Sequence, residues 1–246
     1  MSAGFRVVIP ARYASSRLPG KPLADIVGKP MISRVCERAL ESGATEVCVA
    51  TDDERIAAAI AHTDASVELT SADHESGTDR IAEVAAKRQW SGDTIVVNVQ
   101  GDEPLIPPAL VSQVADVLRS DTEASVATLV TPIESDDEWR DPNVVSVVLD
   151  RHDRALYFSR APIPWPLDGT MPHADRHIGL YAYRVSALLE LAATPPCDTE
   201  RVEKLEQLRA LWLGMKIAVA TAIEVPPRGV DTPADLERAR AALTGR

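Results

Sequence analysis

The sequence has little that would place the protein in a membrane, in an oxidising compartment or on nucleic acid. No apolar run approaches the roughly 18 residues that a transmembrane helix requires, and residues 1–6 lack the basic-then-apolar order of a signal peptide. The three cysteines, Cys36, Cys48 and Cys197, form no CxxC pair, so we expect reduced, mostly buried thiols in a cytoplasmic protein. With 26 basic against 37 acidic residues and a net charge of −11, broad binding to nucleic acid or to anionic membranes is not expected.

Several sequence motifs of nucleotide binding and catalysis are also absent. There is no G-x-x-x-x-G-K-[ST] and no G-x-G, which excludes the P-loop and the dinucleotide-binding fingerprint. There is no HExxH and no G-x-S-x-G, so neither a zinc site nor a serine nucleophile is supported. The 246 residues are 45% hydrophobic and 26% charged, which is ordinary for a globular protein and ample for a sizeable core.

The first half of the chain alternates short apolar runs with segments of helical spacing. Strands are predicted at residues 5–9, 46–50, 66–69 and 94–99, the first of them ended by Pro10. Helices are predicted at 31–40, 52–60, 78–88 and 108–118, the second of them with an N-cap at Thr51-Asp52. Such alternation implies an α/β, Rossmann-like fold, a mostly parallel sheet with helices on both faces. Ligands in such sheets bind outside the carboxyl ends of the strands.

The second half is less regular. Strands are predicted at 124–133, 144–150, 155–158, 177–184 and 216–223, with a hairpin turn at 150–153, and helices at 186–192, 199–213 and 233–243. The helix at 199–213 would bury Val202, Leu205, Leu208, Leu211 and Trp212. We expect an irregular loop at 161–176 and a solvated loop in the acidic run 134–141. The chain then forms a single domain, 1–246, with a smaller subdomain at about 132–184.

A basic loop follows the first predicted strand. Residues 10–22 carry Arg12, Arg17 and Lys21 and no acid, so the loop is locally positive in a chain whose net charge is negative. At the carboxyl end of a strand, backbone amides of Ser and Gly can donate to phosphate oxygens, while Arg and Lys add charge. The loop therefore fits a polyphosphate. The alternative is a solvated loop whose cations pair with surface acids.

Two aspartates follow predicted strands in places that suit a metal. Asp102 follows the most apolar strand, and Asp231 lies between the last strand and the last helix. Asp102 could instead be a turn residue, and Asp231 a helix cap. However, Thr232 and Asp235 already supply the cap and its acidic partner, so capping does not need Asp231. Mg²⁺ is typically held by one or two carboxylates together with substrate phosphates.

Residues 12–23 resemble the signature loop of the sugar nucleotidyltransferases, and in detail that of the CMP-Kdo synthetases, or 3-deoxy-manno-octulosonate cytidylyltransferases. Further segments at 72–80, 98–104, 157–161, 176–179, 205–209 and 229–233 resemble the same family and occur in its order, between residue 5 and about residue 240. The ordered set is far more specific than any one segment. The resemblance implies a nucleotide-diphospho-sugar transferase type of fold and a homodimer formed largely through the subdomain.

The resemblance also implies a reaction. CTP and the eight-carbon sugar acid 3-deoxy-manno-octulosonate (Kdo) would give CMP-Kdo and pyrophosphate, for lipopolysaccharide-type glycan synthesis. The family's catalytic positions match Arg12, Lys21, Asp102 and Asp231, the two aspartates holding Mg²⁺. An anionic sugar must approach an anionic triphosphate, so Mg²⁺, Lys21 and Arg12 would offset the repulsion.

The family's binding positions also carry over to this chain. Those for CTP match Pro10, Ala11, Arg12, Arg17, Lys21, Ser76, Gly77, Arg80, Gln100 and Asp102; those for the sugar acid match Gln100, Arg160, His177, Tyr181, Glu206 and Gln207. Without the resemblance, His177 fits strand packing, Glu206 and Gln207 fit the polar face of a helix, and Asp79 fits a helix start. Arg176, Lys204 and Arg209 are then charges on a helix face or a pocket rim.

The stretch between Trp165 and Arg176 is short for the family and unlike its usual sequence. Because this stretch borders the expected sugar-acid pocket, it leaves open a different or amino-modified sugar acid. A non-catalytic nucleotide-binding protein is a further alternative. The presence of Lys21, Asp102 and Asp231 argues against that alternative.

Overall fold

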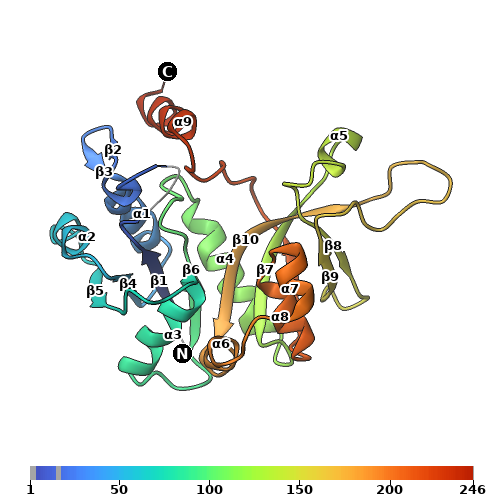
Figure 1. Ribbon diagram of the computed structural model, residues 1–246, viewed down its shortest axis with the longest axis horizontal. Helices are drawn as coiled ribbons and strands as arrows, with labels where there is room; N and C mark the ends of the chain where they lie inside the picture. The colour runs from blue at the N-terminus through green and yellow to red at the C-terminus, as the bar shows by residue number, and fades with distance from the viewer. Residues whose placement is uncertain (1–3, 15–17, 246) are drawn as a thin grey trace.

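The computed structural model describes residues 4–14 and 18–245 (Figure 1). The strands are β1 (Arg6–Ala11), β2 (Asp25–Ile26), β3 (Lys29–Pro30), β4 (Glu46–Thr51), β5 (Ser66–Leu69), β6 (Ile95–Asn98), β7 (Val126–Pro132), β8 (Ser146–Leu149), β9 (Ala155–Ser159), β10 (Asp175–Arg184) and β11 (Ile217–Thr221). The helices are α1 (Met31–Leu40), α2 (Glu54–Ala59), α3 (Gly77–Lys87), α4 (Pro108–Ser120), α5 (Asp136–Trp139), α6 (Val185–Ala193), α7 (Asp198–Glu203), α8 (Gln207–Trp212) and α9 (Pro233–Thr244), with a 3₁₀ turn, η1 (Lys21–Leu23).

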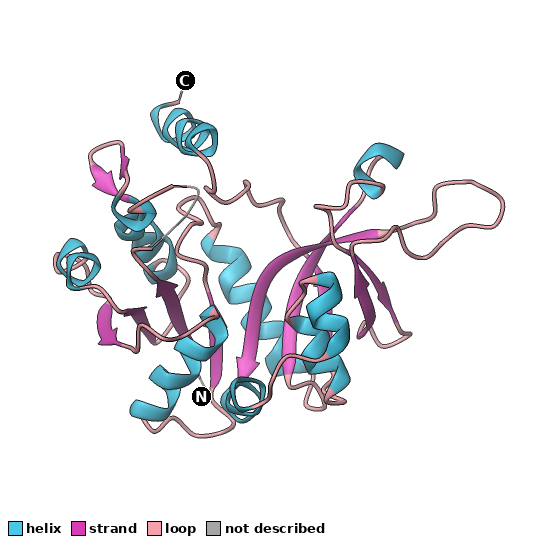
Figure 2. Ribbon diagram, viewed as in Figure 1, coloured by secondary structure: helices cyan, strands magenta, loops and turns pink. Residues whose placement is uncertain are grey.

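One sheet organises the described part of the chain. Its strands follow the order β11-β7-β10-β6-β1-β4-β5, and the β8–β9 hairpin joins through β10 (Figure 2). Strand β1 pairs in parallel with β4 and β6, β4 with β5, and β11 with β7. Strand β10 is antiparallel to both β6 and β7. The prediction of a mostly parallel sheet is confirmed.

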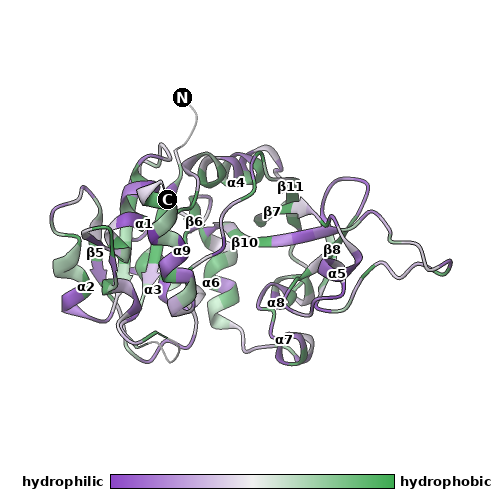
Figure 3. Cartoon of the chain, turned by 90° about the horizontal axis from the view of Figure 1, so that it is seen from above, coloured by the Kyte–Doolittle hydropathy of each residue, from purple (hydrophilic) through white to green (hydrophobic). Residues whose placement is uncertain are grey.

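Helices cover both faces of the sheet, as the apolar strands predicted. In β1, Val7 and Ile9 pack into one core cluster with α1, α2 and α4, while Val8 packs into a second cluster with α3, α6 and α8. Figure 3 shows α4 on one side of the sheet and α3 and α6 on the other. Neither face of a central strand meets water, which explains why its sequence reads as a continuous apolar run.

Two predicted boundaries in the first half were wrong. Strand β1 continues through Pro10 to Ala11, because β6 pairs with β1 only as far as Val8, so one edge of β1 makes no ladder at Pro10. The N-cap of α2 is Asp53, whose Oδ1 accepts from the backbone N–H of Arg55 at 2.9 Å.

The helix predicted at 199–213 was also wrong. The segment instead forms two short helices, α7 and α8, joined by residues 204–206, and Lys204 has a left-handed φ of 56°. Val202 is 82% exposed and Trp212 65% exposed, whereas Leu205 and Leu208 are buried. A straight helix would put all of these on one face; the break at Lys204 instead turns the start of α8 toward the sheet.

The acidic run at 134–141 contains the short helix α5 rather than only a solvated loop. Ser135 caps this helix, its hydroxyl accepting from the backbone N–H of Glu138. Trp139 is buried in a small cluster with Ile133, Val144 and Ala174. This cluster and the β8–β9 hairpin lie within the predicted subdomain at about 132–184, around the N-terminal end of β10 in Figure 1. No helix in the described ranges is long and apolar enough to cross a bilayer.

Candidate active site

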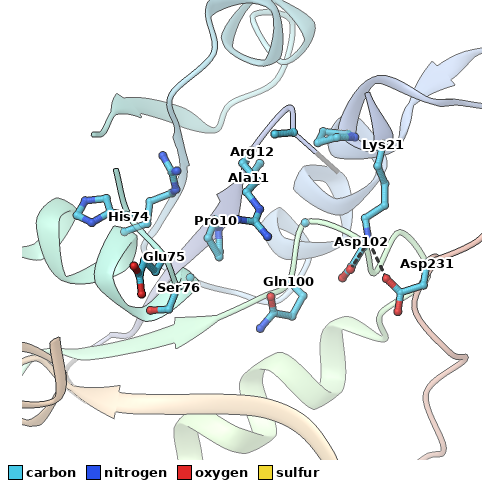
Figure 4. A pocket seen from close by; sticks show the side chains of 15 residues that line it. Pro10, Ala11, Arg12, Lys21, His74, Glu75, Ser76, Gln100, Asp102 and Asp231 are labelled. Atoms are coloured by element: carbon cyan, nitrogen blue, oxygen red, sulfur yellow. Dashed lines mark hydrogen bonds and ion pairs between the residues drawn. The ribbon is translucent and has the colours of Figure 1, made fainter. Parts of the chain in front are cut away.

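A cleft of about 300 Å³ lies at the carboxyl ends of β1 and β6 (Figure 4). It is lined by Pro10, Ala11, Arg12, Ala14, Lys21, Pro22, His74, Glu75, Ser76, Gly77, Arg80, Gln100, Gly101, Asp102 and Asp231. The structure therefore brings together every described residue that was predicted to bind CTP. Arg17, the remaining one, lies outside the described residues.

Parallel pairing of β1 and β6 sets the floor of the cleft. Val8 of β1 registers with Asn98 of β6, so the segments that follow the two strands emerge at the same edge of the sheet. Gly101 lies so close to the first of them that an added Cβ would come within 2.9 Å of the Pro10 carbonyl oxygen. Only glycine fits such an approach without moving backbone.

The start of α3 forms a second wall of the cleft. Ser76 caps the helix by accepting from the backbone N–H of Asp79 at 3.1 Å, and the Asp79 carboxylate accepts from the Ser76 N–H at 3.2 Å. Asp79 thus has the helix-start role that the residues alone suggested. Arg80, 3% exposed, is fixed by donating to the hydroxyl of Thr70 and, at 3.4 Å, to Asp52.

The acidic end of the cleft is built from three distant segments. Lys21 Nζ donates to Asp102 Oδ2 at 2.6 Å and to Asp231 Oδ1 at 3.1 Å. The backbone N–H of Val230 donates to the Asp102 carbonyl at 2.8 Å, which holds the two aspartate segments side by side. The cap of α9 is made by Thr232 and Asp235, so the Asp231 carboxylate is not used for capping, as the sequence predicted.

This donor set fits a magnesium ion. In the described ranges there is no group of three or more His, Cys, Asp or Glu that could hold a metal, so the protein offers two carboxylates, Asp102 and Asp231. Mg²⁺ accepts such a set because phosphates and water complete its octahedron. Burial and the Asp102 charge raise the pKa of the neighbouring Glu103 to about 8.

A second cavity of about 150 Å³ lies beside the first. It is lined by Gly77, Thr78, Asn98, Gln100, Val126, Tyr181, Tyr183, Leu191, Glu206, Gln207 and Ala210. Gly77 and Gln100 line both cavities, so a ligand in one lies next to a ligand in the other. Four residues predicted to bind the sugar acid are found here: Gln100, Tyr181, Glu206 and Gln207.

Polar atoms in the second cavity lack hydrogen-bond partners. Asn98 Oδ1, Tyr181 Oη and Gln207 Nε2 are buried and have no partner among the described residues. Burial raises the pKa of Tyr181 well above its usual value, so its hydroxyl remains a donor. Burial also raises the pKa of Glu206, which accepts from the Thr78 hydroxyl. Buried polar groups without partners are costly, and a polyhydroxylated ligand would satisfy these.

Arg160 and His177 line neither cavity. The Arg160 guanidinium donates to the carbonyl oxygens of Glu203 and Pro142 at 2.7 and 3.0 Å. The His177 ring packs between Phe158 and Tyr181, and its desolvation lowers the pKa of His177 to about 3. His177 has the packing role that the residues alone favoured. Among the described residues that line the second cavity there is no Lys or Arg.

Arg209 is not the rim charge that was expected. Only 6% exposed, it makes two hydrogen bonds to the Glu200 carboxylate, at 2.8 and 2.6 Å. It also donates to the carbonyl oxygens of Leu191 and Thr194. This pair ties α6, α7 and α8 together and so holds one wall of the second cavity. Arg176 instead bonds Thr131 and Glu138.

Sequence reasoning missed several residues that line the two cavities. His74 and Glu75 belong to a segment that resembled the family, but neither was assigned to the site. Thr78, Asn98 and Tyr183 were missed in the second cavity. Asn98 carries a signal that could have revealed it, because it is a polar residue inside an otherwise apolar strand. Thr78 and Tyr183 carry none, since each fits an ordinary helix start or strand.

Comparison with known proteins places this site in context. A family model described as cytidylyltransferase matches residues 6–217. Proteins named 3-deoxy-manno-octulosonate cytidylyltransferase from Tolumonas auensis and Thioalkalivibrio sulfidiphilus are 55% and 56% identical to this chain. The matches cover 96% and 95% of this chain and 95% and 96% of those proteins. A solved structure of CMP:2-keto-3-deoxy-manno-octonic acid synthetase complexed with CTP is 46% identical, with a TM-score of 0.91 over 98% of this chain and 99% of that one.

Proposed function

We propose that this chain, which belongs to the cytidylyltransferase family, transfers CMP from CTP to Kdo and releases pyrophosphate. Relatives of almost the same length carry the name of this reaction, and a similar solved structure is described as a complex with CTP. The family resemblance and the fold type inferred from the sequence are thereby confirmed.

The observation that carries the proposal is the pair of adjacent cavities. The cleft has cations and the start of a helix, which suit a triphosphate, and it has Asp102 and Asp231, which suit the Mg²⁺ that accompanies the phosphates. The second cavity has buried donors and acceptors that find no partner within residues 4–14 and 18–245, and these suit sugar hydroxyls. Because Gln100 and Gly77 line both, the acceptor hydroxyl and the α-phosphorus would lie next to each other, as an in-line displacement requires.

The chain's own groups would work mainly by electrostatics. Arg12 and Lys21 reduce the repulsion between an anionic acceptor and an anionic triphosphate, and they stabilise the charge on the departing pyrophosphate. Asp102 and Asp231 would hold Mg²⁺, which supplies further neutralisation of the phosphates. Gln100, between the two cavities, orients the acceptor. Tyr181 and Gln207 then fix the sugar ring by hydrogen bonds.

Assembly, location and pathway are part of the same proposal. Leu156, Tyr157, Trp165 and Leu167 are exposed apolar side chains within the 132–184 region, and we propose that they pack against a second copy of the chain in a homodimer. The three cysteines are free thiols, which suits work in the reducing cytoplasm. The product would feed lipopolysaccharide-type glycan synthesis.

Substrate choice is tested directly by pyrophosphate release. The purified protein is mixed with Mg²⁺, Kdo and each of the four common ribonucleoside triphosphates in turn. We expect release with CTP and none without Kdo. Release with another triphosphate would contradict the assignment of the base. A folded protein that binds CTP but releases nothing with Kdo would exclude Kdo, and an amino-modified sugar acid would then be tested.

Tyr181→Phe tests the second cavity. Loss of the hydroxyl should raise the KM for Kdo about three- to tenfold, the value of one hydrogen bond, and should leave the KM for CTP unchanged. The free energy of unfolding should not fall, because the hydroxyl has no partner among the described residues. Ser120→Ala removes a hydroxyl from an exposed residue of α4 that lines neither cavity and serves as the control. An unchanged KM for Kdo in Tyr181→Phe would remove this hydroxyl from acceptor binding.

A further inference from the structure

Lys21 lies between the two carboxylates that would hold the metal. Its Nζ atom is 2.6 Å from Asp102 and 3.1 Å from Asp231. The Lys21 side chain is 15% exposed, against 30% for Asp102 and 45% for Asp231, so the ammonium is the most buried of the three groups. Its backbone is held at the start of η1, where the backbone N–H of Lys21 donates to the Leu18 carbonyl at 3.0 Å.

This geometry makes the ammonium and a metal ion competitors for the same carboxylate oxygens. Two carboxylates that face one another repel unless a cation lies between them, and Lys21 supplies that cation. A divalent ion at the same place would be a like charge within a few ångströms of the ammonium, which is strongly unfavourable where solvent screening is reduced. Metal can therefore be held by both aspartates only if the ammonium moves away.

The Lys21 ammonium can move away when the cleft holds another anion that accepts it. An ammonium leaves two carboxylates readily only if another anion accepts it, and phosphate oxygens are suitable acceptors. A triphosphate would provide that anion for Lys21 and, at the same time, the remaining oxygen ligands for a magnesium ion. Metal and nucleotide would then bind cooperatively. The nucleotide accepts the ammonium that competes with the metal, and the metal displaces the ammonium toward the nucleotide.

We propose that Lys21 is a place-holding cation: it keeps Asp102 and Asp231 together in the nucleotide-free protein and keeps divalent metal out until a nucleoside triphosphate draws it away. This role deepens the proposed nucleotidyltransferase function and rests on it. It is separate from the stabilisation of phosphate charge by Lys21 during the reaction, because it acts before any substrate is bound.

The test is metal binding by the protein without nucleotide. Mn²⁺ alone is titrated into the protein, and the free ion is measured by electron paramagnetic resonance. We expect Lys21→Met to bind Mn²⁺ at least about tenfold more tightly than the wild type, since a full positive charge is removed from the site. Lys21→Arg keeps the charge and should bind as weakly as the wild type. Lys21→Gln repeats the neutral change with a polar side chain, in case the Met variant does not fold.

Arg12→Met is the matched control for general electrostatics. Arg12 also lines the cleft but makes no ion pair with either aspartate among the described residues, so its removal should tighten Mn²⁺ binding much less. Equal gains in Arg12→Met and Lys21→Met, or no gain in folded Lys21→Met or Lys21→Gln, would overturn the proposal. Pyrophosphate release by the wild type is measured separately, so failure of the proposed function is distinguished from failure of this inference.

Discussion

Asp102→Asn is expected to lower kcat for pyrophosphate release by about 10²–10³-fold, the usual loss when one electrostatic contact to the reacting phosphoryl group is removed. The amide keeps the size of the side chain but cannot hold a cation as a carboxylate does. It also leaves Lys21 with a neutral group in place of its 2.6 Å partner. The measurement is made at saturating CTP, Kdo and Mg²⁺, so that weaker binding does not conceal the change in rate.

Asp116→Asn is the control for this prediction. Asp116 lies on α4 with a 63% exposed side chain and pairs only locally with Arg119, so the same change of charge there should leave kcat unchanged. Thermal unfolding of Asp102→Asn should remain cooperative, because the side chain is partly exposed. A kcat near that of the wild type in a folded Asp102→Asn protein would remove Asp102 from the metal site.

Arg209→Met is expected to lower the free energy of unfolding by about 3–5 kcal/mol, the typical loss when one partner of a buried ion pair is removed. The Glu200 carboxylate, in a residue only 9% exposed, would be left buried without its cation. The carbonyl oxygens of Leu191 and Thr194 would lose the donor that Arg209 supplies. Urea unfolding measures the change.

Arg201→Met provides the comparison for an exposed pair. Arg201 contacts Asp198 on the same helix, with side chains 58% and 98% exposed, and its loss should cost less than about 1 kcal/mol. The double variant Glu200→Gln with Arg209→Met should recover part of the stability, because the unpaired buried charge is then gone. A loss below about 1 kcal/mol in Arg209→Met would show that the pair does not anchor α8.

The second cavity should respond to the same substitution. Glu206 and Gln207 lie at the start of α8, three and two residues before Arg209, and Leu191 lies on α6; all three line the cavity. In the folded Arg209→Met protein the KM for Kdo should therefore rise relative to the wild type. It should rise by a larger factor than the KM for CTP.

The sequence by itself determined the parts of this protein that depend on local chemistry. Apolar runs such as Val7 to Ile9 predicted strands buried on both faces, and Thr232 with Asp235 predicted the cap of α9, in which the Asp231 carboxylate has no part. The basic loop and Asp102 were placed at the carboxyl ends of strands, and parallel pairing then brings those ends to one edge of the sheet. The family resemblance was equally a property of the sequence, because its segments keep their order along the chain.

Only the tertiary structure decided which side chains meet across the chain. Lys21 reaches Asp102 across 81 positions and Asp231 across 210, and Thr78 meets Glu206 across 128; no local pattern encodes such pairs. The left-handed turn at Lys204, the burial of Arg209 and the position of Arg160 outside both cavities likewise follow from how α6, α7 and α8 pack on the sheet. The physical reason is that spacing along the chain specifies the face of a helix or strand, whereas packing of elements distant in sequence specifies what that face touches.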